Sequence, residues 1–179
     1  MKLNLITVNF SNDALLEKLT GSLKKILNIS INTHQLKLDF SDSYSSERGQ
    51  YYSTEILLKC KKNLSVLEGY KILLVEMDIY VPALTYIFGE AELNGEFAIV
   101  SLARLKPEFY MNPTDSEVFF KRILKEVLHE FGHNLGLYHC IDWDCVMHSS
   151  NNIDEVDLKG SDYCRNCRQI INRDIVKVF

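Results

Sequence analysis

The sequence predicts a mixed α/β fold in which helices pack on a twisted sheet. Apolar and polar residues alternate in several short segments, as in strands, and apolar residues recur every three or four positions in longer segments, as in helices. The two kinds of segment follow one another along most of the chain, which is typical of α/β architectures. With 179 residues, of which 46% are hydrophobic and 25% charged, the chain can form one domain with a substantial core.

The first third of the chain contains two strand–helix pairs. Residues 2–10 alternate in polarity and form the first predicted strand, and residues 12–27 follow with helical spacing. Residues 31–40 form the second predicted strand. Residues 41–50 are polar and include four serines, so we expect an exposed loop there. Helical spacing returns at residues 51–59, which are predicted to form the second helix.

The middle of the chain contains three predicted strands. Residues 71–78 include a continuous apolar run, which is typical of a strand buried on both faces. Residues 85–92 and 96–105 are predicted to form a hairpin, because the Asn94-Gly95 pair between them is a strong signal for a tight turn. After a loop with two prolines, residues 115–135 form a long amphipathic helix, and the remaining tail is expected to be irregular.

Charge and hydropathy exclude several classes of protein. The 24 acidic and 20 basic residues give a net charge of −4, which argues against a dedicated nucleic-acid-binding protein. No apolar run is long enough to span a membrane, and residues 1–8 are too short and too strand-like for a signal peptide. We therefore expect a cytoplasmic, monomeric protein that binds neither nucleic acid nor membranes.

Three of the five histidines fall within eleven residues, with the spacing H-E-x-x-H-x-x-G-x-x-H. His129 and His133 lie on one face of the predicted helix and can bind one metal ion. Glu130 is not placed as a third ligand but can reach a metal-bound water. Gly136 permits the left-handed turn that ends the helix and brings His139 to the same ion. Three protein ligands and one open position are typical of a catalytic zinc site. The alternative interpretation is that these are surface histidines on an amphipathic helix.

Four of the five cysteines form two close pairs near the C-terminus, Cys140 with Cys145 and Cys164 with Cys167. In a reducing compartment such clusters more often bind metal than form disulfides. Their spacing is close to that of closed tetrahedral zinc sites, which are structural and not catalytic. Two disulfides and a redox-active C-x-x-C pair are the alternatives. Cys60 stands alone and is expected to be a buried, unreactive thiol.

The run H-E-F-G-H-N-L-G-L-Y-H-C at residues 129–140, followed by Met147 and by C-R-N-C at residues 164–167, resembles the archaemetzincin family of metallopeptidases. The arrangement of the cysteines separates this family from other metzincins. The resemblance extends to residues 72–75 and 88–104, where the family has its central and edge strands.

The resemblance implies a zincin-like (metzincin) fold that forms a single catalytic domain over residues 1–179. An N-terminal subdomain, residues 1–136, carries the sheet and the active-site helix, and a small C-terminal subdomain, residues 137–179, contains a structural zinc. A cleft lies between the two. The resemblance further implies two zinc ions per chain. The catalytic zinc is expected on His129, His133 and His139, and the structural zinc on Cys140, Cys145, Cys164 and Cys167.

The resemblance also implies a zinc-dependent metallopeptidase, in which Glu130 acts as general base and then as general acid during hydrolysis of a peptide bond. Met147 is expected to form the Met-turn, a hydrophobic floor beneath the metal. The substrate peptide would pair with an edge strand at residues 86–92 as an added strand. Tyr163 and His148 are candidates for stabilising the oxyanion, with a structural role as the alternative for each. The residues expected to contact the peptide backbone are Phe88, Gly89, Glu90 and Ala91.

The main alternative function is a catalytically silent zinc-binding protein that binds peptides or partners in the same cleft. A zinc hydrolase that acts on another bond and a purely structural two-zinc scaffold are further alternatives. All three histidines and Glu130 are present, which favours the peptidase.

Overall fold

A five-stranded sheet forms the centre of the protein. The structure is a computed structural model, and it describes residues 1–171 and 175–177. The strand order is β2-β1-β5-β8-β7; the first four strands run parallel, and β7 pairs antiparallel with β8 at one edge. The predicted mixed α/β fold is therefore confirmed. The strands are β1 (Lys2–Val8), β2 (Ser30–Leu36), β5 (Tyr70–Val75), β7 (Gly89–Ala91) and β8 (Phe97–Ser101).

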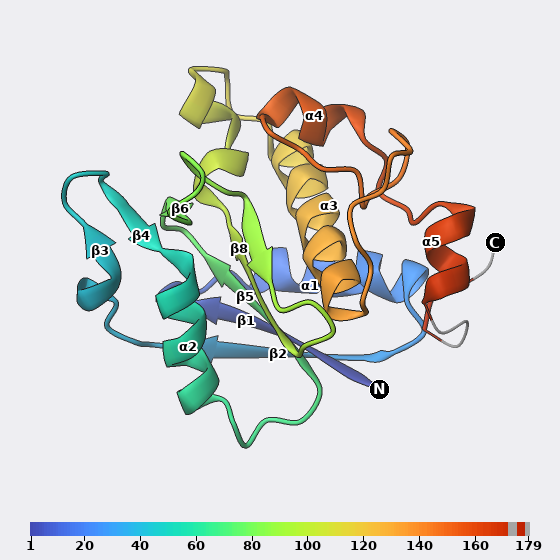
Figure 1. Cartoon of the computed structure of the whole chain (residues 1–179), viewed down its shortest axis with the longest axis horizontal. Coiled ribbons are helices and arrows are strands. Elements are labelled where there is room, and N and C mark those ends of the chain that lie inside the picture. Colours follow the sequence, from blue (N-terminus) through green and yellow to red (C-terminus); the bar gives the residue numbers. More distant parts are fainter. Residues whose placement is uncertain (172–174, 178–179) are drawn as a thin grey trace.

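Helices cover both faces of this sheet (Figure 1). Helices α1 (Asp13–Ile26) and α3 (Ser116–Asn134) pack on one face, and α2 (Ser53–Asn63) packs on the other. Two short helices follow α3, namely α4 (Ile153–Leu158) and α5 (Arg165–Ile170). A second sheet, ordered β3-β4-β6, consists of β3 (Tyr44–Ser45), β4 (Gln50–Tyr52) and β6 (Ile79–Tyr80). Single 3-10 turns lie at Ser41–Ser43, Ala103–Leu105 and Pro107–Tyr110.

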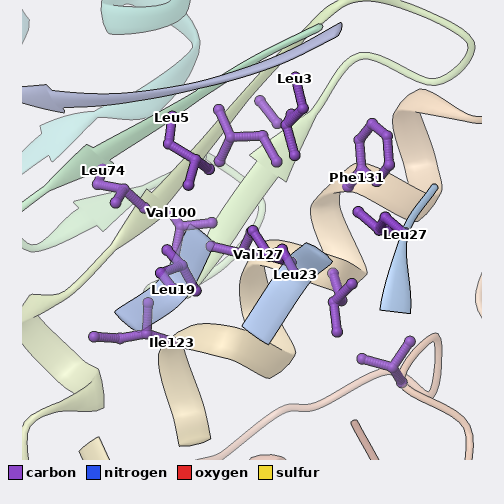
Figure 2. Close-up of a cluster of buried hydrophobic side chains, with 14 of the residues drawn as sticks. Leu3, Leu5, Leu19, Leu23, Leu27, Leu74, Val100, Ile123, Val127 and Phe131 are labelled. Carbon is purple, nitrogen blue, oxygen red and sulfur yellow. The ribbon is translucent and has the colours of Figure 1, made fainter. Parts of the chain in front are cut away.

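The alternation of side chains along the strands divides the core into two layers. Leu3 and Leu5 of β1 face α1 and α3, whereas Ile6 and Val8 face α2. The apolar run at residues 72–75 is fully buried, as predicted for a strand that is covered on both faces. Figure 2 shows the larger layer, in which α1 and α3 meet the sheet through Leu19, Leu23, Val127 and Phe131.

The first connecting segments differ from the prediction. Residues 41–50 do not form only a loop, because β3 and β4 pair as a small hairpin closed by Gly49, whose φ is +66°. The second helix begins at Ser53 and not at residue 51, since β4 extends through Tyr52. The second strand ends at Leu36 and not at residue 40.

The predicted hairpin exists, but its strands are shorter than expected. β7 has three residues and β8 ends at Ser101, after which the chain forms a 3-10 turn. The edge of the sheet next to α3 is therefore short. Among the described residues, no helix combines the length and the hydropathy needed to cross a membrane.

The tail is not irregular throughout, since it contains α4 and α5. Helix α4 is held on α3 by two ion-pair contacts between Arg122 and Asp157, at 2.6 and 2.8 Å, and by Lys125, which donates to the carbonyl of Val156. A six-residue helix is too short for helical periodicity to show in the sequence and is not stable alone. These contacts with α3 therefore explain why the helix forms.

Candidate active site and metal centres

Helix α3 carries the H-E-x-x-H segment and positions its side chains. The helix is capped by Asp115, whose carboxylate accepts hydrogen bonds from the backbone N–H groups of Glu117 and Val118, both at 2.9 Å. The helix ends at Asn134. Gly136 follows with a φ of +91°, a left-handed conformation that glycine adopts at little cost, as predicted. The chain therefore reverses direction directly after the helix.

The three histidines of the motif lie together beside the end of this helix. The ring centroid of His133 lies 4.8 Å from that of His129 and 5.0 Å from that of His139. The Nδ1 atom of His129 lies 2.8 Å from the Val146 carbonyl oxygen, and the Nδ1 atom of His133 lies 2.7 Å from the Leu137 carbonyl oxygen. A carbonyl only accepts, so each Nδ1 carries the proton and each Nε2 keeps a free lone pair.

The remaining ring nitrogens converge. The Nε2 atoms of His129 and His133 lie 3.2 Å apart, and one nitrogen from each of the three histidines lies within 4.8 Å of the others. Burial and the nearby Lys159 lower the pKa of His129 well below its ordinary value, and burial lowers the pKa of His133 as well. Neutral imidazole is the form that binds metal, so this donor set fits one cation with an open coordination position.

Glu130 lies in the same cleft as the histidines. Its side chain is 4% exposed and packs against Gly89 of the edge strand β7. Burial, together with the negative charge of Glu126, raises the pKa of the Glu130 carboxyl well above its ordinary value. A carboxyl group with a raised pKa exchanges protons more readily near neutral pH, which suits general acid–base chemistry.

The cleft lies between β7 and α3 and has a volume of about 550 Å³. Its lining includes the four residues predicted to contact a peptide, although these four differ in where their side chains go. The Phe88 ring is buried in the core. The Glu90 carboxylate accepts hydrogen bonds from the hydroxyls of Ser53 and Thr54 at the start of α2. The lining residues from the predicted set are Phe88, Gly89, Glu90, Ala91, Glu130, His129, His133 and His139.

Residues 149–151, which follow His148, also line the cleft. The hydroxyl of Tyr86 donates to the carbonyl of Asn151 at 2.9 Å and so joins these residues to the segment that precedes β7. The exposed side chain of Tyr138, next to His139, lines the cleft as well.

A buried ion pair beside His129 was not predicted from the sequence. The Nζ atom of Lys159 lies 2.8 Å from a carboxylate oxygen of Glu126 and 3.5 Å from the Nδ1 atom of His129. Both charged side chains line the cleft, although Lys159 is 1% and Glu126 3% exposed. Glu126 precedes Glu130 by one helical turn, so helical spacing could have placed it on this face. No sequence pattern marks Lys159, which lies in the tail.

Two residues of the tail, Met147 and Tyr163, contact α3 directly. Met147 is fully buried, and a Cβ atom on Gly132 would collide with its sulfur. The hydroxyl of Tyr163 donates to the carbonyl of Leu128 at 2.6 Å. The absence of a side chain at Gly132 therefore lets Met147 pack directly against the active-site helix.

The two candidates for oxyanion stabilisation point elsewhere. Tyr163 is buried with its hydroxyl bound to the helix backbone, and the Nδ1 atom of His148 lies 3.0 Å from the carbonyl oxygen of Cys140. The His148 ring packs against Trp143 in a tilted arrangement, with centroids 3.9 Å apart. Neither residue is part of the cleft lining, which favours the structural alternative for both.

The four cysteines of the two pairs form a second cluster. The Sγ atoms of Cys140 and Cys164 lie 3.8 Å apart, those of Cys145 and Cys167 lie 3.7 Å apart, and all four lie within 4.8 Å of one another. All are free thiols, so the two disulfides are not formed. Burial raises the pKa of the Cys145 thiol to about 11, so binding of a metal must release its proton. Four sulfur atoms in this arrangement fit a closed tetrahedral zinc site.

The two clusters share one turn of the chain. His139 directly precedes Cys140, whose N–H donates to the carbonyl of Met147 at 2.9 Å. The N–H of His148 in turn donates to the carbonyl of Cys145, also at 2.9 Å. The segment that follows the third histidine is thus bonded to the segment that lies beneath α3.

Comparisons with known proteins agree with this arrangement. The sequence profile of Peptidase family M54 matches residues 29–173. An archaemetzincin of Methanocaldococcus jannaschii is 49% identical over 125 residues, which cover 70% of this chain and 68% of the relative. The structure of archaemetzincin from Methanopyrus kandleri superposes with a TM-score of 0.81 at 31% identity, over 97% of this chain and 94% of that chain. A zinc-dependent peptidase from Methanocorpusculum labreanum gives a TM-score of 0.85 at 27% identity, over 95% and 100% of the two chains.

Proposed function

The chain belongs to the archaemetzincin family of metallopeptidases, peptidase family M54, and on this basis we propose that it hydrolyses peptide bonds in the cleft between β7 and α3, with Glu130 as general base and general acid. The resemblance carried by the histidine motif and the four cysteines is thereby confirmed, as is the zincin-like fold. One observation carries the proposal: the Glu130 carboxyl group lies in the same cleft as three histidines whose ring nitrogens converge.

We infer that His129, His133 and His139 hold the catalytic zinc. The carbonyl groups of Val146 and Leu137 fix the tautomer and orientation of the first two rings before any metal binds. Zinc in such a site supplies Lewis acidity, which lowers the pKa of water to about 7 and polarises a carbonyl oxygen. The exposed position of His139 at the rim of the cleft leaves this side accessible to substrate.

Glu130 would move the proton. Its carboxylate accepts a proton from the attacking water and returns it to the nitrogen of the leaving amine, so the group ends the cycle in its starting state. Burial favours the protonated form between these two steps, because it raises the pKa of the carboxyl. Such positioned proton transfer contributes about 10²- to 10⁴-fold to the rate of a typical enzyme.

The substrate peptide would add a strand to β7. Phe88 and Glu92 both form backbone hydrogen bonds with β8. Because the direction of these bonds alternates along an antiparallel strand, Gly89 and Ala91 turn their N–H and C=O groups toward the free edge. Of the four predicted contact residues, we therefore assign Gly89 and Ala91 to the peptide backbone, while Phe88 and Glu90 attach the strand to the rest of the protein.

We also propose that Cys140, Cys145, Cys164 and Cys167 hold a second, structural zinc, so that each chain binds two ions. Met147 would form the apolar floor of the catalytic site, for which its buried position under α3 is suited. Zinc counting tests this part directly: two ions per chain are expected. One ion per chain would show that one of the sites is wrongly assigned.

We propose a monomer that acts as one catalytic domain, in which residues 1–136 supply β7 and α3 and residues 137–179 supply further residues of the cleft lining. We further propose that it binds neither nucleic acid nor membranes. The free thiols suit the reducing environment of a cytoplasm. Analytical ultracentrifugation would measure the oligomeric state.

Cleavage of a quenched peptide library by the zinc-loaded protein, with and without a chelator, tests the proposed activity. We expect cleavage that stops when zinc is removed. Zinc-dependent binding of peptides without cleavage would instead identify the catalytically silent alternative. If the protein neither cleaves nor binds peptides, the remaining alternatives are a hydrolase that acts on another substrate and a structural protein.

A further inference from the structure

We propose that Gly89 is a positioning residue for Glu130. Because Gly89 has no side chain, the edge strand lies directly against the Glu130 carboxyl group and fixes the place of that group in the cleft. The catalytic consequence rests on the proposed function of Glu130, whereas the contact itself does not. Gly89 lies in strand β7, and a glycine within a strand normally weakens it.

The contact is close enough that no other residue type fits without a change. A Cβ atom built on Gly89 would lie 2.5 Å from a carboxylate oxygen of Glu130 and 2.7 Å from both Cδ and Cγ of the same side chain. All three distances are shorter than any normal contact between such atoms. At this point the backbone of the edge strand therefore lies directly against the side chain of Glu130 on α3.

The backbone at this position does not itself require glycine. The described glycines with positive φ are Gly49, Gly69 and Gly136, and Gly89 is not among them. An alanine could therefore adopt the same backbone conformation. At Gly69, in contrast, an added Cβ atom would meet a backbone carbonyl. At Gly89 the three nearest atoms all belong to one flexible side chain, that of Glu130.

The strand cannot easily move away instead. β7 is paired with β8, and the neighbouring Glu90 accepts a 2.8 Å hydrogen bond from Thr54 and a second one from Ser53, both on α2. Retreat of the strand would break these bonds on the other side of the sheet. A methyl group at position 89 should therefore displace the Glu130 carboxyl and leave the fold almost unchanged.

The variant Gly89→Ala separates the two roles. We expect zinc content and the midpoint of urea unfolding to stay close to those of the wild type, while kcat falls by about 100-fold, because misplacement of a catalytic group by about 1 Å costs that much. KM should change far less than kcat. Gly21→Ala is the matched control, since a Cβ atom there meets nothing within 4 Å. An unchanged kcat in Gly89→Ala, or a loss explained by unfolding, would overturn the proposal.

A second substitution tests whether the effect passes through Glu130. Glu130→Ala removes the three atoms that a methyl group at position 89 would meet at 2.5 to 2.7 Å. Gly89→Ala should therefore lower the residual kcat much less in the Glu130→Ala background than in the wild type. Multiplication of the two separate losses in the double variant would show that Gly89 acts by another route.

Crystal structures of the zinc-loaded wild type and of Gly89→Ala keep the proposal testable even if no peptide is cleaved. If the wild type has no peptidase activity, only the proposed function is refuted. The positioning role stands if the Glu130 carboxyl is displaced in the variant while β7 stays in place. It is wrong if Glu130 keeps its position and the strand moves.

Discussion

Replacement of Cys167 by serine tests the structural metal centre through its effect on stability. The change removes one of the four thiols and leaves a hydroxyl group of similar size at a buried position. A zinc ion that joins Cys140 to Cys167 closes a loop of about 28 residues, and the chain-entropy relation for such a link gives roughly 3.6 kcal/mol. We therefore expect the free energy of unfolding of the zinc-loaded protein to fall by about 3–4 kcal/mol.

Urea denaturation followed by circular dichroism measures this loss, and zinc is counted in the same samples. Cys60→Ser is the matched control, because Cys60 is also buried but lies on α2, outside the cluster. Its cost should be that of a hydroxyl group in apolar surroundings, about 1–2 kcal/mol, with two zinc ions retained. If Cys167→Ser retained two ions and lost no more stability than Cys60→Ser, the assignment of the structural zinc would be refuted.

The same variant should weaken zinc binding at the histidines. His139 adjoins Cys140, and the N–H group of Cys140 is bonded to the carbonyl of Met147 beneath α3. Loss of the cysteine site should loosen this turn and lower the affinity of the histidine site, which titration with a competing chelator measures. Equal affinity in Cys167→Ser and the wild type would show that the two sites are independent.

Two further predictions concern ionisable groups of the metal-free protein. Because burial lowers the pKa of His129 in the folded state, the unfolded chain binds its proton more readily, so stability should be full above about pH 6.5 and decrease below it. Glu130→Gln should have the opposite sign. The raised pKa means that the ionised carboxylate penalises the folded state, so the variant should be more stable than the wild type at pH 7, with a smaller gain toward pH 5. Urea denaturation in chelator buffer between pH 5 and 8 measures both effects, and the His129 effect is measured in the Glu130→Gln background. A midpoint that does not change with pH would contradict the prediction for His129. Equal stability of Glu130→Gln and the wild type at pH 7 would contradict the prediction for Glu130.

The sequence predicted the main sheet and α3 because both have long, regular patterns. The apolar run at residues 72–75 and the caps and spacing of residues 115–135 are local signals, and each corresponds to an observed element. The 44–52 hairpin and helices α4 and α5 have no such signal. They are short, and α4 depends on contacts such as Arg122 with Asp157 that join distant parts of the chain.

The candidate site divides in the same way. His129, Glu130 and His133 lie within one helix, so their spacing alone places them on one side of α3. The proximity of Lys159 to Glu126 and the contact of Gly89 with Glu130 arise only when the tail and the edge strand pack on this helix. Sequence spacing therefore predicts residues that share an element, whereas partners from other elements require the tertiary structure.

Peptide cleavage by zinc-loaded Glu130→Ala, compared with the wild type at equal zinc content, tests the central claim most directly. The histidines are unchanged in this variant, so it should bind two zinc ions as the wild type does. We expect kcat/KM to fall by at least about 100-fold, because the group that accepts and returns the proton is missing. Full activity of Glu130→Ala with both zinc ions bound would contradict the proposed mechanism.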